Sequence, residues 1–255
     1  MSENPYAAPG SDPEAPEPVP GGRGLPWEDP GPPFPRAWDT LRLILQDPGE
    51  AGARIAARKA LGPAIAFALL VGLPFQWLGQ ALAALWTKVD ESGATNAAFF
   101  KALHLPPPPA PTPESAAMAK TFLWVQVVMT PLVLALGLLL MGLLAHAGLW
   151  MLRGLERGRG LEATFRTLLY VSAATAWAGF LNVFGLLLPG SLHTVHILFS
   201  LALGLGLLTF QGLVLGHAHG IQPWRGILAV FLPWLILGCC LAACLAPVAM
   251  GGLAG

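Results

Sequence analysis

The chain has 255 residues, of which 55% are hydrophobic and 11% are charged, and its formal net charge at pH 7 is zero. Soluble domains carry about 25% charged residues, so this composition excludes an ordinary soluble fold. Zero net charge also argues against a nucleic-acid-binding protein. After Arg166 the only charged residue is Arg225, which indicates an integral membrane protein.

The first segment, residues 1–35, is rich in proline and glycine and carries scattered acidic residues. Such a composition buries too little apolar surface to offset the entropy lost on ordering. We therefore predict a disordered cytoplasmic tail. Within it, Leu25-Pro-Trp27-Glu28 is the best candidate for a docking peptide, although we favour a solvated tether.

Residues 36–59 are predicted to form amphipathic helices next to the membrane. Phe34, Trp38, Leu41 and Leu45 follow helical spacing, with polar residues on the rest of the helix surface. A short helix of this kind, with a tryptophan at its edge, lies in the headgroup layer of a membrane.

A second helix is predicted to begin directly afterwards. Asp47 suits the N-cap, Pro48 the first helical position and Glu50 the third. We expect this helix to continue through Arg58 into the first membrane span.

Five apolar runs are long enough to cross a hydrocarbon layer of about 30 Å. They cover about 60–86, 122–152, 164–188, 193–216 and 226–250. The predicted fold class is therefore all-α: a polytopic bundle of five transmembrane helices over 60–250, with a disordered tail and a short interfacial helix.

The third span is expected to lie in the middle of the bundle. Its apolar run is interrupted by Ser172, Thr175, Trp177, Gly179 and Asn182. Small and weakly polar residues at this spacing suit contact between helices better than contact with lipid.

Two sets of intramembrane polar residues are predicted from their depth along the helices. Gln80, Gln126 and Asn182 fall in the outer half of the membrane, and His146 and Gln211 fall in the inner half. We favour hydrogen bonds between helices for both sets. A substrate or proton site at His146 and Gln211 stays open as the functional alternative.

Glycines in the fourth span are predicted to contact other helices. Gly206 follows Ala202 by four residues and Gly216 follows Gly212 by four. Such pairs allow close helix approach, so we expect Gly206 and Gly212 to face neighbouring helices.

Basic residues predict the orientation of the chain. With the N-terminus in the cytoplasm, eleven of the 14 Lys and Arg residues fall on the inner side, and only Lys88, Lys101 and Lys120 fall outside. This bias, together with five spans, places the C-terminus outside.

Signatures of catalysis are missing from the sequence. We find no nucleophile with a neighbouring base, no paired carboxylates, no phosphate-binding loop and no zinc motif. We expect no enzymatic activity, no cofactor and no metal.

Several residues together carry a resemblance to a known family. They are Trp27 and Glu28 before the spans, Arg166 and Tyr170 at the start of the third, and Gly185 near its far end. Their order and spacing resemble bacterial members of the Yip (Ypt-interacting protein) domain family. The resemblance implies five membrane spans and no known chemistry. We expect the protein to lie in a bacterial inner membrane.

Two functions remain as hypotheses. Eukaryotic members of the family act in vesicle traffic with small GTPases, a role that does not transfer to this chain because it shows no clear match to the eukaryotic motifs. We therefore expect a membrane-organising or scaffold protein, and the alternative is a small-solute or ion transporter. The expected partner is the lipid bilayer, joined by another membrane protein or a second copy of the chain, and not nucleic acid.

Overall fold

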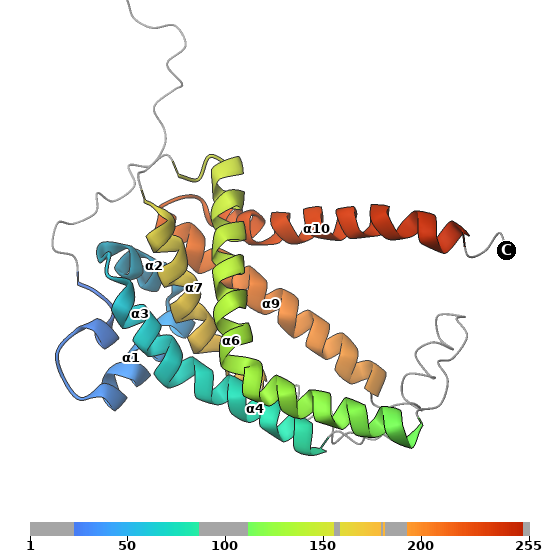
Figure 1. Ribbon diagram of the computed structural model, residues 1–255. Coiled ribbons are helices and arrows are strands. Elements are labelled where there is room, and N and C mark those ends of the chain that lie inside the picture. Colours follow the sequence, from blue (N-terminus) through green and yellow to red (C-terminus); the bar gives the residue numbers. More distant parts are fainter. Residues whose placement is uncertain (1–22, 87–111, 156–158, 180, 182–192, 252–255) are drawn as a thin grey trace, which may run out of the picture.

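The computed structural model describes residues 23–86, 112–155, 159–179, 181 and 193–251, and this part is helical without any strand. Figure 1 shows the arrangement. In chain order the elements are η1 (Pro26–Glu28), α1 (Pro33–Gln46), α2 (Pro48–Ala57), α3 (Leu61–Phe67), η2 (Ala68–Gly72), α4 (Leu73–Trp86), α6 (Pro113–Met151), α7 (Leu161–Thr175), α9 (His193–His219) and α10 (Pro223–Gly251).

Among the described residues, three stretches are long and apolar enough to cross a membrane. They are Leu61–Leu85, which runs through α3, η2 and α4, then Pro113–Met151 and Val195–His219. These correspond to the first, second and fourth expected spans, and the all-helical fold class is confirmed. At the third and fifth positions lie α7, with 15 residues, and α10, with 29. The count of five spans stays a prediction.

The predicted start of α2 is confirmed. The Asp47 side chain accepts a hydrogen bond from the Glu50 backbone N–H at 2.9 Å, and Pro48 occupies the first turn. The expected continuation into the first span is wrong, because α2 ends at Ala57 and Arg58 is extended. Pro63 accounts for the break, since a proline can lie in the first turn of a new helix but lacks the N–H that a continuing helix needs.

The first span contains a five-residue π-helical segment, η2, between α3 and α4. Pro74 follows this segment by two residues and cannot donate to the Leu70 carbonyl. A wider turn at this point is the expected local response to a missing helical hydrogen bond.

Helix α6 changes direction part-way along its length (Figure 1). Pro131 lies inside α6 and accounts for this bend. The missing proline N–H would have bonded to the Val127 carbonyl, four residues earlier. That carbonyl accepts instead from the Trp77 indole at 2.9 Å, which joins α6 to α4.

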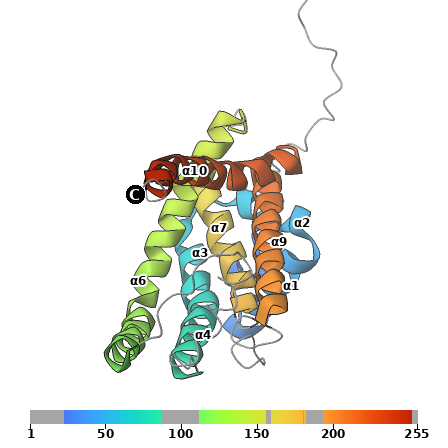
Figure 2. The same cartoon turned by 90° about the vertical axis from the view of Figure 1, so that its right-hand side faces the viewer.

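Helix α7 lies in the middle of the fold, as the sequence predicts for the third span, 164–188, of which the structure describes 164–179 and 181. It packs against α2, α3, α6 and α9, and Figure 2 shows it between α6 and α9. Thr175 is buried and Ser172 is half-buried, whereas Trp177 is 44% exposed. Asn182 lies outside the described residues.

Part of the predicted tail belongs to the fold. Leu25 is fully buried, in a core cluster with Ile44, Ile55, Phe67 and Tyr170. The prediction that disorder extends to residue 35 is therefore wrong for 23–35, and residues 1–22 lie beyond what the structure describes.

Helix α1 has both a core face and an exposed apolar face. Thr40 and Ile44 are buried, while Phe34 and Trp38 are 82% and 62% exposed. The apolar face predicted for the headgroup layer is therefore only partly confirmed. Phe34, Trp38 and Leu45 are exposed, as contact with lipid requires, but Leu41 packs against the core.

Several helix ends meet on one side of the fold. The Arg166 side chain at the start of α7 donates to the Ala60 carbonyl before α3 at 2.6 Å. Arg159, two residues before α7, donates to the Ala218 carbonyl at the end of α9. Gly154 after α6 lies close to Ile221, which precedes α10. Successive long helices therefore alternate in direction.

Glycines allow close contact between α9 and α10. A Cβ added at Gly212 would lie 2.8 Å from the Ile227 nitrogen and 2.9 Å from the Gly226 oxygen. The expectation for Gly206 does not hold among the described residues, where no atom lies within 4 Å of such a Cβ.

Candidate functional site

A buried charge network joins the segment before α1 to the central helix. Glu28 Oε1 accepts hydrogen bonds from Arg166 Nη2 at 2.5 Å and from the Tyr170 hydroxyl at 2.7 Å. Arg58 Nε lies 3.7 Å from Glu28 Oε2. We call Glu28, Arg58, Arg166 and Tyr170 the Glu28 network.

The charges of this network are shielded from solvent. The Arg166 and Glu28 side chains are 0% and 1% exposed. Glu28 Oε2 and Arg166 Nε have no hydrogen-bond partner among the described atoms. A buried charge without its counter-ion is strongly destabilising, so Glu28 and Arg166 depend on each other.

Trp27 anchors the same segment through its backbone and its ring. Its backbone N–H donates to Thr40 Oγ1 and its indole N–H to the Pro63 carbonyl, both at 2.8 Å. The ring packs edge-on against Phe67 with centroids 5.5 Å apart, and Phe67 in turn lies 5.2 Å from the Tyr170 ring. Segment 23–29 is therefore held by packing, hydrogen bonds and charge together.

Two arginines outside the core close over this segment. Arg36 lies 5.3 Å from the Trp27 ring centroid and donates to the Trp27 carbonyl at 3.1 Å. Arg58 donates to the Glu28 carbonyl at 3.0 Å and to the Asp29 carboxylate at 3.1 Å. These two contacts are more exposed, so they contribute less than the buried pair.

Four of the five residues that carry the family resemblance lie in or beside the Glu28 network. Trp27, Glu28, Arg166 and Tyr170 come from two distant parts of the chain and lie in one cluster, while Gly185 lies outside the described residues. Their contacts were not predicted from the sequence. A usable signal was present, because Arg166 is the only charge in the expected spans and such a charge requires a partner.

A second polar cluster joins α6, α7 and α9. His146 Nδ1 lies 3.1 Å from Thr164 Oγ1, and the same oxygen lies 3.0 Å from His219 Nε2. Thr164 and His219 are fully buried. One hydroxyl can donate to one ring and accept from the other, so these three residues form a continuous histidine–hydroxyl–histidine chain.

The predicted partnership of His146 and Gln211 is wrong. His146 pairs with Thr164, and the Gln211 amide donates to Ser172 Oγ at 3.4 Å. Both residues do hydrogen-bond between helices, as expected, but each does so with α7.

The polar residues predicted for the outer half of the membrane do not form a buried cluster in the described part of the chain. Gln80 on α4 and Gln126 on α6 are both exposed, and Asn182 is not within the described part. Contact between α4 and α6 instead includes the Trp77 bond to the Val127 carbonyl.

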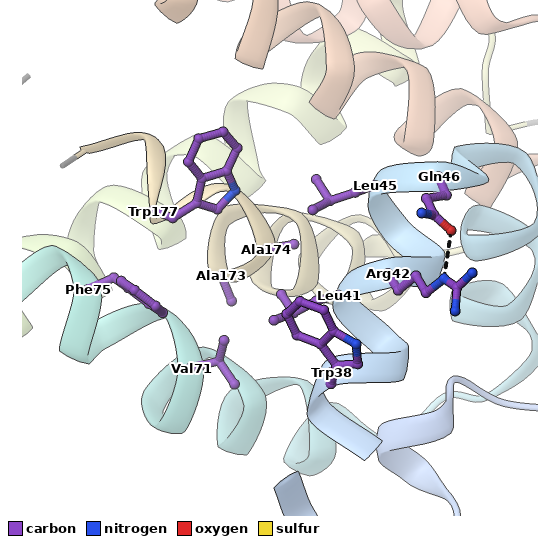
Figure 3. Close-up of a pocket in the computed structure, with 10 residues that line it drawn as sticks. All are labelled: Trp38, Leu41, Arg42, Leu45, Gln46, Val71, Phe75, Ala173, Ala174 and Trp177. Carbon is purple, nitrogen blue, oxygen red and sulfur yellow. Dashed lines mark hydrogen bonds between the residues drawn. The ribbon is translucent and has the colours of Figure 1, made fainter. Parts of the chain in front are cut away.

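A pocket of about 470 Å³ lies between α1, the η2–α4 segment and the end of α7. Figure 3 shows the side chains around it. Its lining consists of Trp38, Leu41, Arg42, Leu45, Gln46, Val71, Phe75, Ala173, Ala174 and Trp177. We call this cavity the α1 pocket.

Comparison with protein-family models, with curated proteins and with solved structures finds no match to this chain. The fold and its polar clusters therefore define the class on their own. The part of the chain that the structure describes is all-helical, with three helical stretches suited to crossing a membrane, and the polar clusters described above join elements of this fold.

Proposed function

We propose that this chain is a non-enzymatic, five-span membrane protein of Yip-domain type with a membrane-organising or scaffold role. The observation that carries the proposal is the Glu28 network, which fixes a segment before the spans onto the central helix α7. A scaffold needs such a segment to be held in one position relative to the membrane. No activity is assigned beyond this role.

The hydrogen bonds that the polar side chains make between helices support a scaffold role. Arg166 is paired with Glu28, Gln211 with Ser172, and the Trp77 indole with a backbone carbonyl. Each of these bonds joins two elements of the fold. Polar groups in such bonds stabilise contact between membrane helices, and this is their expected role in a scaffold.

The exposed face of α1 supports contact with the membrane surface. Phe34 and Trp38 on this face are exposed, while Thr40 and Ile44 fasten the opposite face to the core. An amphipathic helix fixed in this way presents its aromatic residues to the headgroup layer.

The proposed orientation has the N-terminus in the cytoplasm and the C-terminus outside, in a bacterial inner membrane. It rests on the eleven basic residues of 14 that fall on the inner side. The alternating direction of the long helices supports it, because the ends near Arg159, Gly154 and Arg166 gather on one side.

Cysteine labelling tests this orientation. Single cysteines at Pro107 and Arg157, in a variant without the native cysteines, should react differently with a membrane-impermeant maleimide on intact cells. We expect labelling at 107 from outside, and labelling at 157 only after the membrane is opened. Labelling at 157 but not at 107 on intact cells would reverse the proposed orientation.

A transporter for a small solute or ion is the second candidate, and the histidine–hydroxyl–histidine chain is the observation that favours it. His146, Thr164 and His219 link three helices, and a continuous chain of titratable and hydroxyl groups suits proton transfer. In a scaffold the same three residues act only as a helix–helix contact.

Proteoliposome flux measurements distinguish the two functions. The scaffold proposal predicts no protein-dependent proton or solute flux for the wild type. It also predicts that His146→Leu lowers the free energy of unfolding in detergent by roughly 0.6–2 kcal/mol, the range for other intramembrane hydrogen bonds. Gln126→Leu serves as the control, because Gln126 is an exposed polar residue on the same helix. A flux that His146→Leu abolishes and Gln126→Leu retains would overturn the scaffold in favour of a transporter.

A further inference from the structure

The α1 pocket has one polar end and one apolar end. Arg42 and Gln46 lie together at one end, whereas Phe75 and Trp177 lie toward the other (Figure 3). Its volume of about 470 Å³ is in the range of pockets that bind small organic ligands, roughly 300–1,000 Å³. A ligand that fills it must therefore be mostly apolar with a polar group at one end.

The apolar end lies at the depth of the hydrocarbon layer. Val71 and Phe75 belong to the candidate span Leu61–Leu85. At 1.5 Å per residue they lie roughly 15 and 21 Å along the helix from its first residue. The apolar wall is therefore provided by a stretch suited to crossing the membrane.

The polar end lies toward the side where the basic helix ends gather. Gln46 is the last residue of α1, and α2 begins two residues later. Helix α2 packs on the end of α9, where a Cβ added at Gly52 would lie 2.7 Å from the His217 side chain. The pocket thus runs from that side into the membrane.

Arg42 provides a positive charge at this polar end. Its Nε donates to Gln46 Oε1 at 2.9 Å, so the side chain is positioned by its neighbour. Among the described residues no carboxylate lies within 4 Å of the Arg42 guanidinium. An exposed arginine without an acidic partner is suited to a phosphate.

The pocket borders surfaces that would face lipid. Trp38 on its α1 wall is 62% exposed, and Leu70, next to the lining residue Val71, is 66% exposed. A hydrocarbon chain can therefore enter from the bilayer without crossing a polar surface.

We propose that the α1 pocket binds one acyl chain of an anionic membrane phospholipid, with the lipid phosphate at Arg42 and Gln46. The aromatic and aliphatic walls exclude water from the chain, and the guanidinium neutralises the phosphate. This proposal rests on the membrane placement of the spans but not on the scaffold role.

Photo-crosslinking tests this proposal. The full-length protein is placed in nanodiscs of phosphatidylglycerol, a fraction of which carries a diazirine in one acyl chain. After illumination, the crosslinked positions are mapped by mass spectrometry. We expect the adducts to concentrate on the pocket residues of α1, η2–α4 and α7.

Two variants with matched controls make the test specific. Arg42→Gln should lower pocket labelling about fivefold, the factor expected for one basic residue near an anionic surface. Arg54→Gln removes the same charge from α2 outside the pocket and should leave pocket labelling unchanged. Val71→Trp should fill the cavity and abolish pocket labelling, whereas Leu70→Trp, on the exposed side of the same segment, should not.

The outcomes are distinct. Pocket labelling that disappears in Val71→Trp but persists in Leu70→Trp supports the proposal, provided that both variants keep wild-type thermal stability. Adducts spread evenly over all exposed helix faces would overturn it, as would pocket labelling unchanged by Arg42→Gln and Val71→Trp. A pocket crosslinked to protein instead of lipid, from this chain or a second copy, would also overturn it. If no position is labelled, the membrane placement itself is wrong. That result contradicts the placement of the spans and is separate from any test of the scaffold role.

Discussion

Replacing Glu28 with glutamine is expected to lower the free energy of unfolding by about 3–5 kcal/mol, because it leaves a buried charge uncompensated. Arg166 is fully buried, and Glu28 is its acidic partner at 2.5 Å. The measurement is thermal unfolding in detergent at fixed protein and detergent concentrations.

Asp29→Asn is the matched control for this substitution. Asp29 also pairs with an arginine, Arg58, but the two side chains are 34% and 42% exposed. Exposed pairs contribute at most about 1 kcal/mol, so we expect a small effect. The double variant Glu28→Leu with Arg166→Met should be less destabilised than Glu28→Leu alone, because both charges are then removed. A cost for Glu28→Gln no larger than that of Asp29→Asn would contradict a buried ion pair.

Gly212→Leu is expected to destabilise the protein by about 1–3 kcal/mol or more, the range for overpacking. The obstruction at Gly212 is the backbone of Ile227 and Gly226, which cannot move aside as a flexible side chain can. Relief requires that α9 and α10 separate, so the contact between these helices is lost.

Gly206→Leu is the control on the same helix. Gly206 is exposed, and no described atom lies within 4 Å of an added Cβ there. We expect a change within about 0.5 kcal/mol, as for other surface substitutions. Equal thermal stabilities for Gly206→Leu and Gly212→Leu would show that the α9–α10 contact does not depend on Gly212.

Local features could be predicted from the sequence because they depend on neighbouring residues. The Asp47 cap and the proline after it specify the start of α2 within four residues. The burial of α7 follows from Ser172 and Thr175 in an otherwise apolar run. These signals need no knowledge of the rest of the fold.

Contacts between distant segments could not be predicted in the same way. Composition alone indicated disorder to residue 35, but Leu25 and Trp27 are ordered by Thr40, Pro63 and Phe67. Such packing provides the stabilisation that the segment lacks by itself. The length of the predicted tail was therefore wrong.

Depth along a helix does not determine which face a residue occupies. His146 and Gln211 were paired by depth alone, and each turned out to face α7. Gly206 and Gly212 are six residues apart, which at 3.6 residues per turn places them about 120° apart around α9. Only one of them can therefore face α10.

Hydrogen–deuterium exchange of the protein in nanodiscs tests most directly whether segment 23–29 is docked on the bundle. The Trp27 amide donates to Thr40 Oγ1 and the Glu28 amide to the Leu25 carbonyl. We predict that both amides exchange slowly in the wild type, and that their protection falls in Glu28→Gln but not in Asp29→Asn. Exchange of residues 25–29 in the wild type at the rate of an unstructured peptide would contradict the claim.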